Sequence, residues 1–307
     1  MTGIVILNYQ TWDISYRCVK NIIKTQQEIL YHIYLVDNAS PNPIPKKFSN
    51  YLEMNKERIT FLQSSKNCGY AAGNNIGINH ALLDGCDNLL ITNNDILFEK
   101  DSVTELIKVL DDEKKIGIAG PKVVNDKGEI QISRCSMKTG IKEIFQIFTV
   151  AKKFFRKKWN KYYCLNQNPD KPAFVYYVSG CCFAISRVCA LEVTPLDEGT
   201  VLYDEELILG IRMEQQGYKT YYNPKSVVVH QHGGTTNQMQ PFMHQCICQS
   251  ELYYCNKYLK AKKWQLSLLY HYRRGLYWIR SRRNDNLREY WNIFNMETKQ
   301  HYRKMLS

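Results

Sequence analysis

The 307-residue sequence lacks several features that would assign it quickly to a class. No stretch reaches the roughly 18 apolar residues that a membrane-spanning helix needs. Its 11 cysteines include no CxxC pair, which argues against a structural zinc site. The first residues enter an apolar, strand-like run without a basic leader. We therefore expect no secretory signal and a cytoplasmic, reducing setting in which the cysteines stay free.

Familiar catalytic motifs are also missing. The sequence has no G-x-x-x-x-G-K-[ST] loop, no H-E-x-x-H and no G-x-S-x-G. Its glycines at Gly69, Gly73 and Gly77 do not form G-x-G-x-x-G. These absences disfavour a P-loop ATPase, a zinc protease, a serine hydrolase and a dinucleotide-binding dehydrogenase.

The net charge of +12 is concentrated in two segments. Residues 257–307 hold 13 Lys or Arg against three acidic residues, and residues 150–163 hold six Lys or Arg and no acid. Both segments are rich in aromatic residues, which suits an anionic membrane surface or single-stranded nucleic acid. A solvated helix face is the plain alternative. The aromatic residues are Phe154, Phe155, Trp159, Tyr162 and Tyr163, and then Tyr270, Tyr272, Tyr277, Trp278 and Trp291.

The first 125 residues alternate between strand and helix patterns. Short apolar runs are followed by segments whose apolar residues have helical spacing. This order predicts an α/β fold with a mainly parallel, Rossmann-like sheet. The predicted strands are 3–7, 33–36, 59–62, 89–92 and 116–119, and the predicted helices are 14–25, 46–54, 71–83 and 102–110.

The remainder of the chain is less regular at first and helical at its end. We expect an irregular excursion over 131–172, strands at 174–178, 182–185 and 227–229, a helix at 205–216 and helices beyond 240. We predict one domain over residues 1–238, in two halves at 1–125 and 126–238. A helical, basic and aromatic extension is predicted to follow over residues 239–307.

Polar residues stop three of the predicted strands: Asn8, Asp37 and the group 93–95 that ends in Asp95. In parallel α/β sheets, ligands bind at the carboxyl ends of the strands. Each polar stop has a turn as its ordinary explanation, but three in succession favour a binding rim. A carboxylate such as Asp95 can hold a divalent cation that bridges a diphosphate.

Two later groups complete the candidate chemistry. Glu205 and Glu206 open a predicted helix, where the helix dipole alone would explain them. The alternative is that one of them removes a proton from a hydroxyl. His230 ends an apolar strand just before His232, Gly233 and Gly234, and is either a metal or phosphate contact or a polar terminus.

Taken in order, these segments resemble the family 2 glycosyltransferases with a GT-A fold, in particular the rhamnosyltransferase-like branch of bacterial polysaccharide assembly. The resemblance covers about residues 3–236 and not the C-terminal extension. It implies that residues 1–125 form the nucleotide-binding half of the domain and residues 126–238 the acceptor and catalytic half. The matching stretches are 4–9, 35–40, 67–77, 90–95, 179–183, 196–212 and 228–230 with Gly233 and Gly234.

The resemblance implies roles for individual positions. It places Asn8 and Asp37 at the nucleoside, makes Asp95 and His230 the metal site, and makes Glu206 the catalytic base with Glu205 as its rival. The further nucleotide-sugar-binding positions are Asn67, Gly69, Asn74 and Asn94, and the acceptor-side positions are Gly180 and Asp197.

Three positions depart from the family's pattern. The D-x-D element reads Asn93, Asn94, Asp95 and keeps one carboxylate. The Glu-Asp pair reads Glu205, Glu206, which lengthens the base by one methylene. A further acidic position is Ile208 here.

The resemblance implies an inverting glycosyltransferase that uses a nucleoside-diphosphate sugar, of the UDP or dTDP type. It implies a divalent cation, and an imidazole ligand favours Mn²⁺ over Mg²⁺. The expected acceptor is a glycan or lipid-linked glycan of cell-surface polysaccharide, handled at the inner face of the membrane. The alternatives are a nucleotidyltransferase, a catalytically weak nucleotide-sugar-binding relative, and a nucleic-acid-binding protein. We expect no nucleic-acid partner, because the basic segments lie away from the predicted rim.

Overall fold

The computed structural model describes residues 1–231 and 240–306. The predicted boundary between residues 238 and 239 lies outside the described residues, as do His232, Gly233 and Gly234.

The N-terminal part forms a parallel sheet, as predicted. Its strands lie in the order β3, β2, β1, β4 and all pair in parallel. Ile4, Ile33 and Leu90 in these strands are fully buried, as expected where helices cover both faces of a parallel sheet. The bounds are β1 (Thr2–Asn8), β2 (Tyr31–Asp37), β3 (Ile59–Gln63) and β4 (Asn88–Asn93).

The sheet continues beyond β4 with mixed direction. The next strands are β10, β6, β11 and β5, and β10 runs antiparallel to both β4 and β6. The short β5 and β8 each pair antiparallel with β11. The bounds are β5 (Ile96–Phe98), β6 (Ile116–Val124), β8 (Ala173–Val175), β10 (Cys182–Ser186) and β11 (Lys219–His230).

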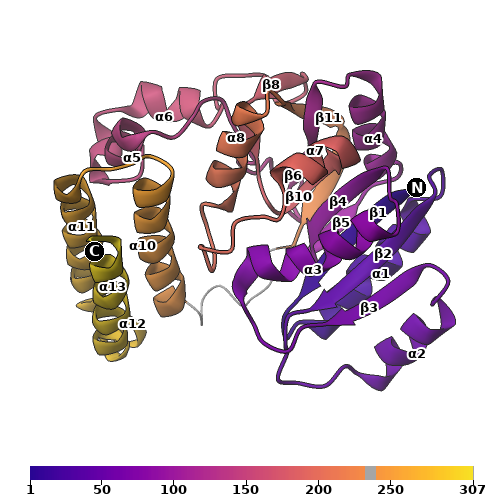
Figure 1. Ribbon diagram of the computed structural model, residues 1–307, viewed down its shortest axis with the longest axis horizontal. Helices are drawn as coiled ribbons and strands as arrows, with labels where there is room; N and C mark the ends of the chain where they lie inside the picture. Colours follow the sequence, from indigo (N-terminus) through magenta and orange to yellow (C-terminus); the bar gives the residue numbers. More distant parts are fainter. Residues whose placement is uncertain (232–239, 307) are drawn as a thin grey trace.

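Helices cover both faces of this sheet (Figure 1). Side chains of α1 (Trp12–Thr25), α2 (Lys46–Met54) and α4 (Ser102–Asp112) share one buried cluster with the sheet. Those of α3 (Gly69–Leu83), α7 (Arg187–Val193) and α8 (Glu205–Gln215) share a second cluster. Three layers therefore leave the carboxyl ends of β1, β2 and β4 open along one edge, as predicted for an α/β fold.

The structure differs from the sequence prediction in the middle of the chain. β6 runs past Pro121, because a register shift in β11 between Asn223 and Val227 accommodates the irregularity there. The predicted strand at 174–178 is divided between β8 and β9 (Tyr177–Val178), and β9 pairs with β7 (Arg134–Cys135) in a separate two-stranded sheet. The stretch predicted to be irregular contains α5 (Ile141–Ile147), η1 (Val150–Lys153) and α6 (Arg156–Tyr162).

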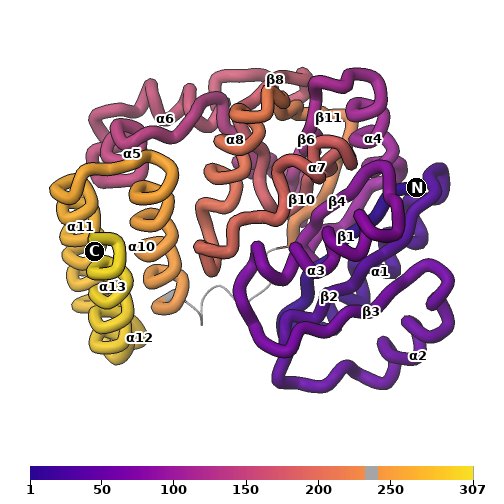
Figure 2. Tube along the Cα trace, in the orientation of Figure 1, coloured from indigo at the N-terminus to yellow at the C-terminus, as the bar shows by residue number. Residues whose placement is uncertain are grey.

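The C-terminal part is helical, as predicted. It consists of α10 (Gln240–Lys257), α11 (Lys263–Ser281), α12 (Asp285–Glu289) and α13 (Trp291–Leu306). Figure 2 shows these helices together at the end of the molecule opposite α2, with α8 between them and the sheet. Their buried cluster includes Leu207, Ile208 and Ile211 of α8, so the two parts share one helix.

The aromatic residues of the basic segments are not all on the surface, which corrects the sequence interpretation. Tyr162, Tyr270 and Tyr277 are core residues, because the inner face of each helix packs on its neighbours. Trp264 and Trp278 of α11 and Phe154 next to η1 are exposed. Across the described ranges, no helix combines the length and apolar character that a bilayer crossing requires.

Candidate active site

Asn8 and Asp37 end adjacent strands and lie side by side, as predicted. The Asn8 amide donates to Asp37 Oδ1 at 2.9 Å, and the Ser40 hydroxyl donates to the same oxygen at 2.6 Å. Both Asn8 and Asp37 are fully buried. Asp37 and Ser40 border a hollow of about 330 Å³ that Trp12 and Phe61 also line. The end of β2 therefore offers a carboxylate beside two aromatic rings.

Asn94 is turned toward α1. Its amide donates to Thr11 Oγ1 and to Ser15 Oγ, each at 2.7 Å, and lies 3.4 Å from Asn8 Oδ1. These bonds tie the end of β4 to the start of α1. Asn94 thus holds the rim in shape, and its predicted contact with a nucleotide sugar stays a prediction.

The remaining predicted nucleotide-binding residues surround the start of α3. Asn67 is exposed and accepts hydrogen bonds from the Asn38 amide at 2.9 Å and from Gly69 N–H at 3.0 Å. Asn74 is fully buried, and its Oδ1 has no hydrogen-bond partner among the described residues. Gly69 has φ of +92°, and a Cβ there would lie 2.3 Å from Val201 O. This position therefore requires glycine, both for its backbone conformation and for its contact with the loop before α8.

Asp95 and His230, the two predicted metal ligands, are brought together. His230 Nε2 lies 3.3 Å from Asp95 Oδ2, and His230 Nδ1 lies 2.9 Å from Gln131 Oε1. Asp95 Oδ1 is buried and has no hydrogen-bond partner within residues 1–231 and 240–306. A buried carboxylate oxygen without a hydrogen-bond partner is suited to bind a cation, since a buried polar atom that stays unpaired lowers the stability of the fold. In the described part of the chain, no three His, Cys, Asp or Glu side chains lie close enough together to hold a metal ion without further ligands.

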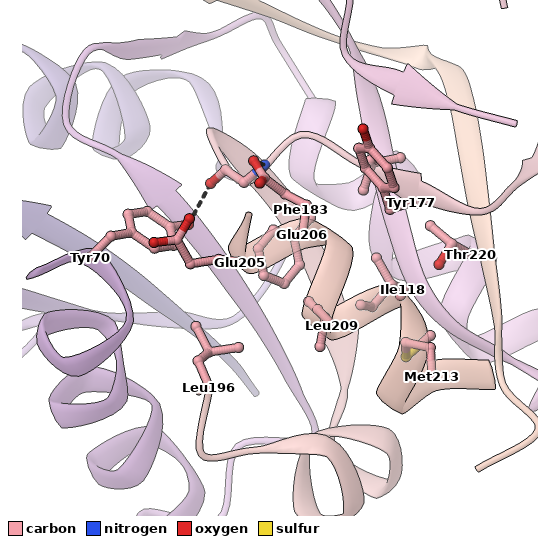
Figure 3. A pocket seen from close by; sticks show the side chains of 13 residues that line it. Tyr70, Ile118, Tyr177, Phe183, Leu196, Glu205, Glu206, Leu209, Met213 and Thr220 are labelled. Atoms are coloured by element: carbon pink, nitrogen blue, oxygen red, sulfur yellow. Dashed lines mark hydrogen bonds between the residues drawn. The ribbon is translucent and has the colours of Figure 1, made fainter. Parts of the chain in front are cut away.

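Glu205 and Glu206 begin α8 and line a small apolar pocket with Tyr70 (Figure 3). Glu206 Oε1 accepts the Gly180 N–H at 2.8 Å, and the Tyr70 hydroxyl donates to Gly180 O at 2.5 Å. A Cβ on Gly180 would lie 3.0 Å from Glu206 Oε1, so glycine permits this approach. Glu206 is thereby fixed to the segment between β9 and β10.

The two glutamates have different surroundings. Glu205 accepts the Thr200 hydroxyl at 3.1 Å. Burial, and then the charge of Glu206, raise the pKa of Glu205 above its ordinary value. Burial also raises the pKa of Tyr70, with the charges of Glu206 and Glu205 acting in the same direction. The Tyr70 phenol therefore stays a hydrogen-bond donor beside Glu206.

The Glu206 and Asp95 sites are connected through the backbone. Asn93 N–H donates to Cys181 O at 2.8 Å, and Cys181 follows Gly180 directly. The end of β4, two residues before Asp95, is thus hydrogen-bonded to the residue that follows the glycine holding Glu206. The structure brings the predicted metal residues and the predicted base to one edge of the sheet.

Asp197 lies at the contact with the C-terminal helices. Its side chain is 6% exposed and accepts from Lys257 Nζ at 2.7 Å, from Tyr253 OH at 2.8 Å and from Tyr258 OH. Burial by itself would raise its pKa, but the bonds from Lys257, Tyr258, Gly199 and Tyr253 outweigh burial and hold the pKa of Asp197 well below its usual range. Asp197 therefore anchors the loop before α8 to α10, and its predicted acceptor contact stays a prediction.

Sequence reasoning missed three residues of the site. The Asn75 side-chain amide donates to Leu196 O at 2.9 Å and accepts from Leu196 N–H at 2.7 Å, and so also holds the loop before α8. Tyr70 and Asn75 belong to the stretch 67–77, which could have identified them. Gln131, which contacts His230, lies in a segment predicted to be irregular and carries no local signal.

Comparisons with known proteins identify relatives of this chain and structures that share its fold. A curated relative, the low-salt glycan biosynthesis hexosyltransferase of Haloferax volcanii, is 24% identical over 206 residues, which are 67% of this chain and 59% of the relative. The chain thus spans less than two thirds of that protein's length.

Two solved structures share the fold. GalNAc-T7 with UDP, GalNAc and Mn²⁺ has a TM-score of 0.58 at 17% identity, over 76% of this chain and 44% of that one. The mannosyltransferase PcManGT from Pyrobaculum calidifontis with GDP-Man and Mn²⁺ has a TM-score of 0.54 at 13% identity, over 99% of this chain and 86% of that one. The fold is the GT-A fold that the sequence predicted.

The sequence profile described as "Glycosyl transferase family 2" matches residues 3–191, which is more than half of the chain. The strand ends that carry Asp37 and Asp95 lie at one edge of the sheet, and Glu206 of α8 is tied to the second of them through Gly180 and Cys181. The chain belongs to glycosyl transferase family 2.

Proposed function

We propose that the protein transfers a sugar from a nucleoside-diphosphate sugar to an acceptor hydroxyl, with inversion at the anomeric carbon. This proposal rests on one observation: the Asp95–His230 pair and Glu206 lie at the same edge of the sheet. Family membership and the GT-A fold support it. The hollow at Asp37, with Trp12 and Phe61, is of a kind that suits a nucleoside base and ribose.

Asp95 and His230 would hold a divalent cation. The orphaned Asp95 Oδ1 and the carboxylate–imidazole donor set fit Mn²⁺ or Mg²⁺, with Mn²⁺ favoured by the imidazole. A cation held by two side chains takes its other ligands from phosphates and water. When bound, it neutralises the charge that builds on the leaving diphosphate.

Glu206 would act as the general base. Its Oε1 is fixed by Gly180 N–H, so its carboxylate has a defined position at the rim. The carboxylate takes the proton of the acceptor hydroxyl, and the hydroxyl oxygen attacks the anomeric carbon. The bond from that carbon to the diphosphate oxygen breaks on the opposite face, and the diphosphate leaves with the bonding electrons. Glu205, whose pKa is raised, would sit beside the base as its neutral neighbour.

The donor type and the acceptor are finer proposals. We infer a UDP or dTDP sugar, in hexosyl or deoxyhexosyl transfer of the rhamnosyltransferase-like kind, for cell-surface polysaccharide. The relatives differ here, because one structure holds UDP and the other GDP-Man. A screen must therefore include all three nucleotides.

The deciding experiment measures binding and hydrolysis of UDP-, dTDP- and GDP-sugars with and without Mn²⁺. Asp95→Ala is expected to abolish metal-dependent turnover, whereas Asp112→Ala, at an exposed position of α4, is the matched control and should keep it. Release of sugar and nucleoside diphosphate supports glycosyl transfer. Release of pyrophosphate would indicate a nucleotidyltransferase, and binding of no nucleotide sugar under any condition would overturn the proposal.

We further propose that the acceptor is lipid-linked and that the protein docks on the inner face of an anionic membrane. Trp264, Leu268, Trp278 and Ile279 are exposed along one side of α11, and Val150 N–H donates to Tyr272 OH at 2.9 Å. That bond brings the two basic segments next to each other. Exposed tryptophans flanked by Lys and Arg suit a lipid interface.

Vesicle sedimentation tests this docking. The protein should pellet with anionic vesicles and not with neutral ones, and Trp264→Ser should reduce the pelleted fraction. Leu83→Ser, which removes an equally exposed apolar residue from α3, is the control and should have no effect. Equal pelleting of both variants would contradict docking through α11.

A further inference from the structure

A second pocket beside the candidate active site contains a buried arginine. The pocket has a volume of about 230 Å³ and is lined by Ser133, Arg134, Tyr163, Leu165 and Tyr222, among others. Arg134 lies on β7 and is 7% exposed. Its guanidinium carbon lies 3.9 Å from the centroid of the Tyr222 ring.

Among the described residues, Arg134 has no carboxylate partner. Within the two described ranges it forms no ion pair, and its Nη1 is buried without a hydrogen-bond partner. Burying an unpaired charge costs several kcal/mol, whereas a cation–π contact returns only about 0.5–2 kcal/mol. By contrast, the Arg273 guanidinium on α11 binds both oxygens of Glu251, each at 2.6 Å. The Arg273 guanidinium is thus paired with a carboxylate. The Arg134 guanidinium, which is near the Tyr222 ring and the Cys164 thiol, faces a pocket that has room for a ligand.

The pocket adjoins both halves of the candidate chemistry. On one side it includes Gln131, whose Oε1 lies 2.9 Å from His230 Nδ1. On the other side, Ser133 O accepts Ser179 N–H at 2.8 Å, next to the glycine that binds Glu206. A ligand in the pocket would therefore extend from the reacting hydroxyl.

We propose that this pocket binds an anionic group of the acceptor, a phosphate or a carboxylate, through the Arg134 guanidinium. A planar guanidinium donates two parallel hydrogen bonds to either anion. The inference rests on the proposed function in one respect, namely that the molecule reaching the pocket is the sugar acceptor. The site would make the enzyme selective for acidic acceptors, because a neutral acceptor would leave the buried charge unpaired.

Isothermal titration calorimetry on the full chain, without divalent cation, tests the pocket. The probes are inorganic phosphate and glucuronate. Leu165→Glu places a carboxylate at an exposed wall of the pocket, where it would compete for Arg134, and is expected to weaken anion binding about tenfold or more. Leu165→Gln has nearly the same shape without the charge and should bind like wild type. Arg134→Met should abolish binding, and the Leu165 pair keeps the test valid if that variant fails to fold.

Each outcome decides the proposal. Binding of phosphate alone supports a phosphorylated, lipid-type acceptor, and binding of glucuronate alone supports an acidic sugar. No binding to wild type, or equal binding to both Leu165 variants, would overturn the pocket. Nucleotide-sugar binding and hydrolysis are measured in parallel on wild type, where they test the proposed function separately from the pocket. If they persist while anion binding is absent, only this inference fails and the proposed function stands.

Discussion

The proposed donor side and the proposed catalytic side of the site are held by different parts of the chain. On the donor side, Asn8, Asp37 and Ser40 bind one another at the ends of neighbouring strands. On the catalytic side, Glu205 and Glu206 begin α8, and that helix packs against the sheet with Leu209 and Met213. Its other side packs against the C-terminal helices.

This difference explains two features of the sequence. Ile208 departs from the family's pattern of acidic residues because it is 2% exposed in the cluster shared with α10 and α11. Asp197 is bonded to three residues of α10 and the turn after it, so the loop before the glutamates depends on those helices. The donor side is thus local to the sheet, whereas the catalytic side needs the C-terminal helices.

The largest effect is expected at the proposed base, Glu206. Glu206→Gln keeps the size of the side chain but cannot accept a proton, so kcat should fall about 10³-fold while donor binding is unchanged. Glu205→Gln is the control and should retain most of the rate. Steady-state kinetics and a donor titration on both variants check this. If Glu205→Gln proves the more damaging change, the roles of the two glutamates are reversed.

The second largest effect is expected from breaking a buried ion pair between the C-terminal helices. The Glu251 and Arg273 side chains are only 6% and 14% exposed, respectively. Glu251→Gln leaves the Arg273 charge without its partner and should lower the free energy of unfolding by about 3 kcal/mol. Urea denaturation measures it. The surface pair Lys56–Glu53 provides the control, since Glu53→Gln should change stability little. An equal loss in both variants would argue against a special role for the buried pair.

The contact between Asp197 and the C-terminal helices should give a smaller effect, in which kcat falls but donor affinity does not. Lys257→Met removes the cation from Asp197 and loosens the loop before α8, so kcat should fall about tenfold while donor affinity is kept. Lys299→Met, at an exposed position of α13, is the matched control. A loss of donor affinity equal to the loss of kcat would show that the two sides are not held separately.

The smallest effect is a dependence of stability on pH. Because burial and then Glu206 raise the pKa of Glu205, the folded chain binds this proton more tightly than the unfolded chain. The stability that the protonated group contributes is present at low pH and lost as pH rises through the raised pKa. Between about pH 5 and about pH 9, wild type should therefore lose on the order of 1 kcal/mol more than Glu205→Gln.

Thermal unfolding at both pH values tests this, with Glu113→Gln, at an exposed position after α4, as the control. A Glu205→Gln variant that follows the wild-type pH profile would contradict the raised pKa.

The sequence predicted the donor side better than the catalytic side, for a physical reason. Asn8, Asp37 and Asp95 follow buried strands, and a short apolar run with a polar stop is visible locally. The partners of Asp197 lie on α10 and beyond it, and those of Arg134 come from separate segments, so no local pattern reveals them. Tyr270 and Tyr277 were read as surface residues because composition does not tell which side of a helix faces inward. The division of the main domain at residue 125 stays a prediction.

The double packing of α8 has a consequence for anyone who recombines this enzyme with its relatives. A chimera that joined residues 1–231 of this chain to the C-terminal helices of another would place foreign side chains against Leu207, Ile208 and Ile211. Because Leu207 and Ile208 directly follow Glu205 and Glu206 in α8, the mismatch would also shift these two glutamates. A chimera designed to exchange acceptor preference should therefore take α8, the loop before it and the C-terminal helices from the same parent protein.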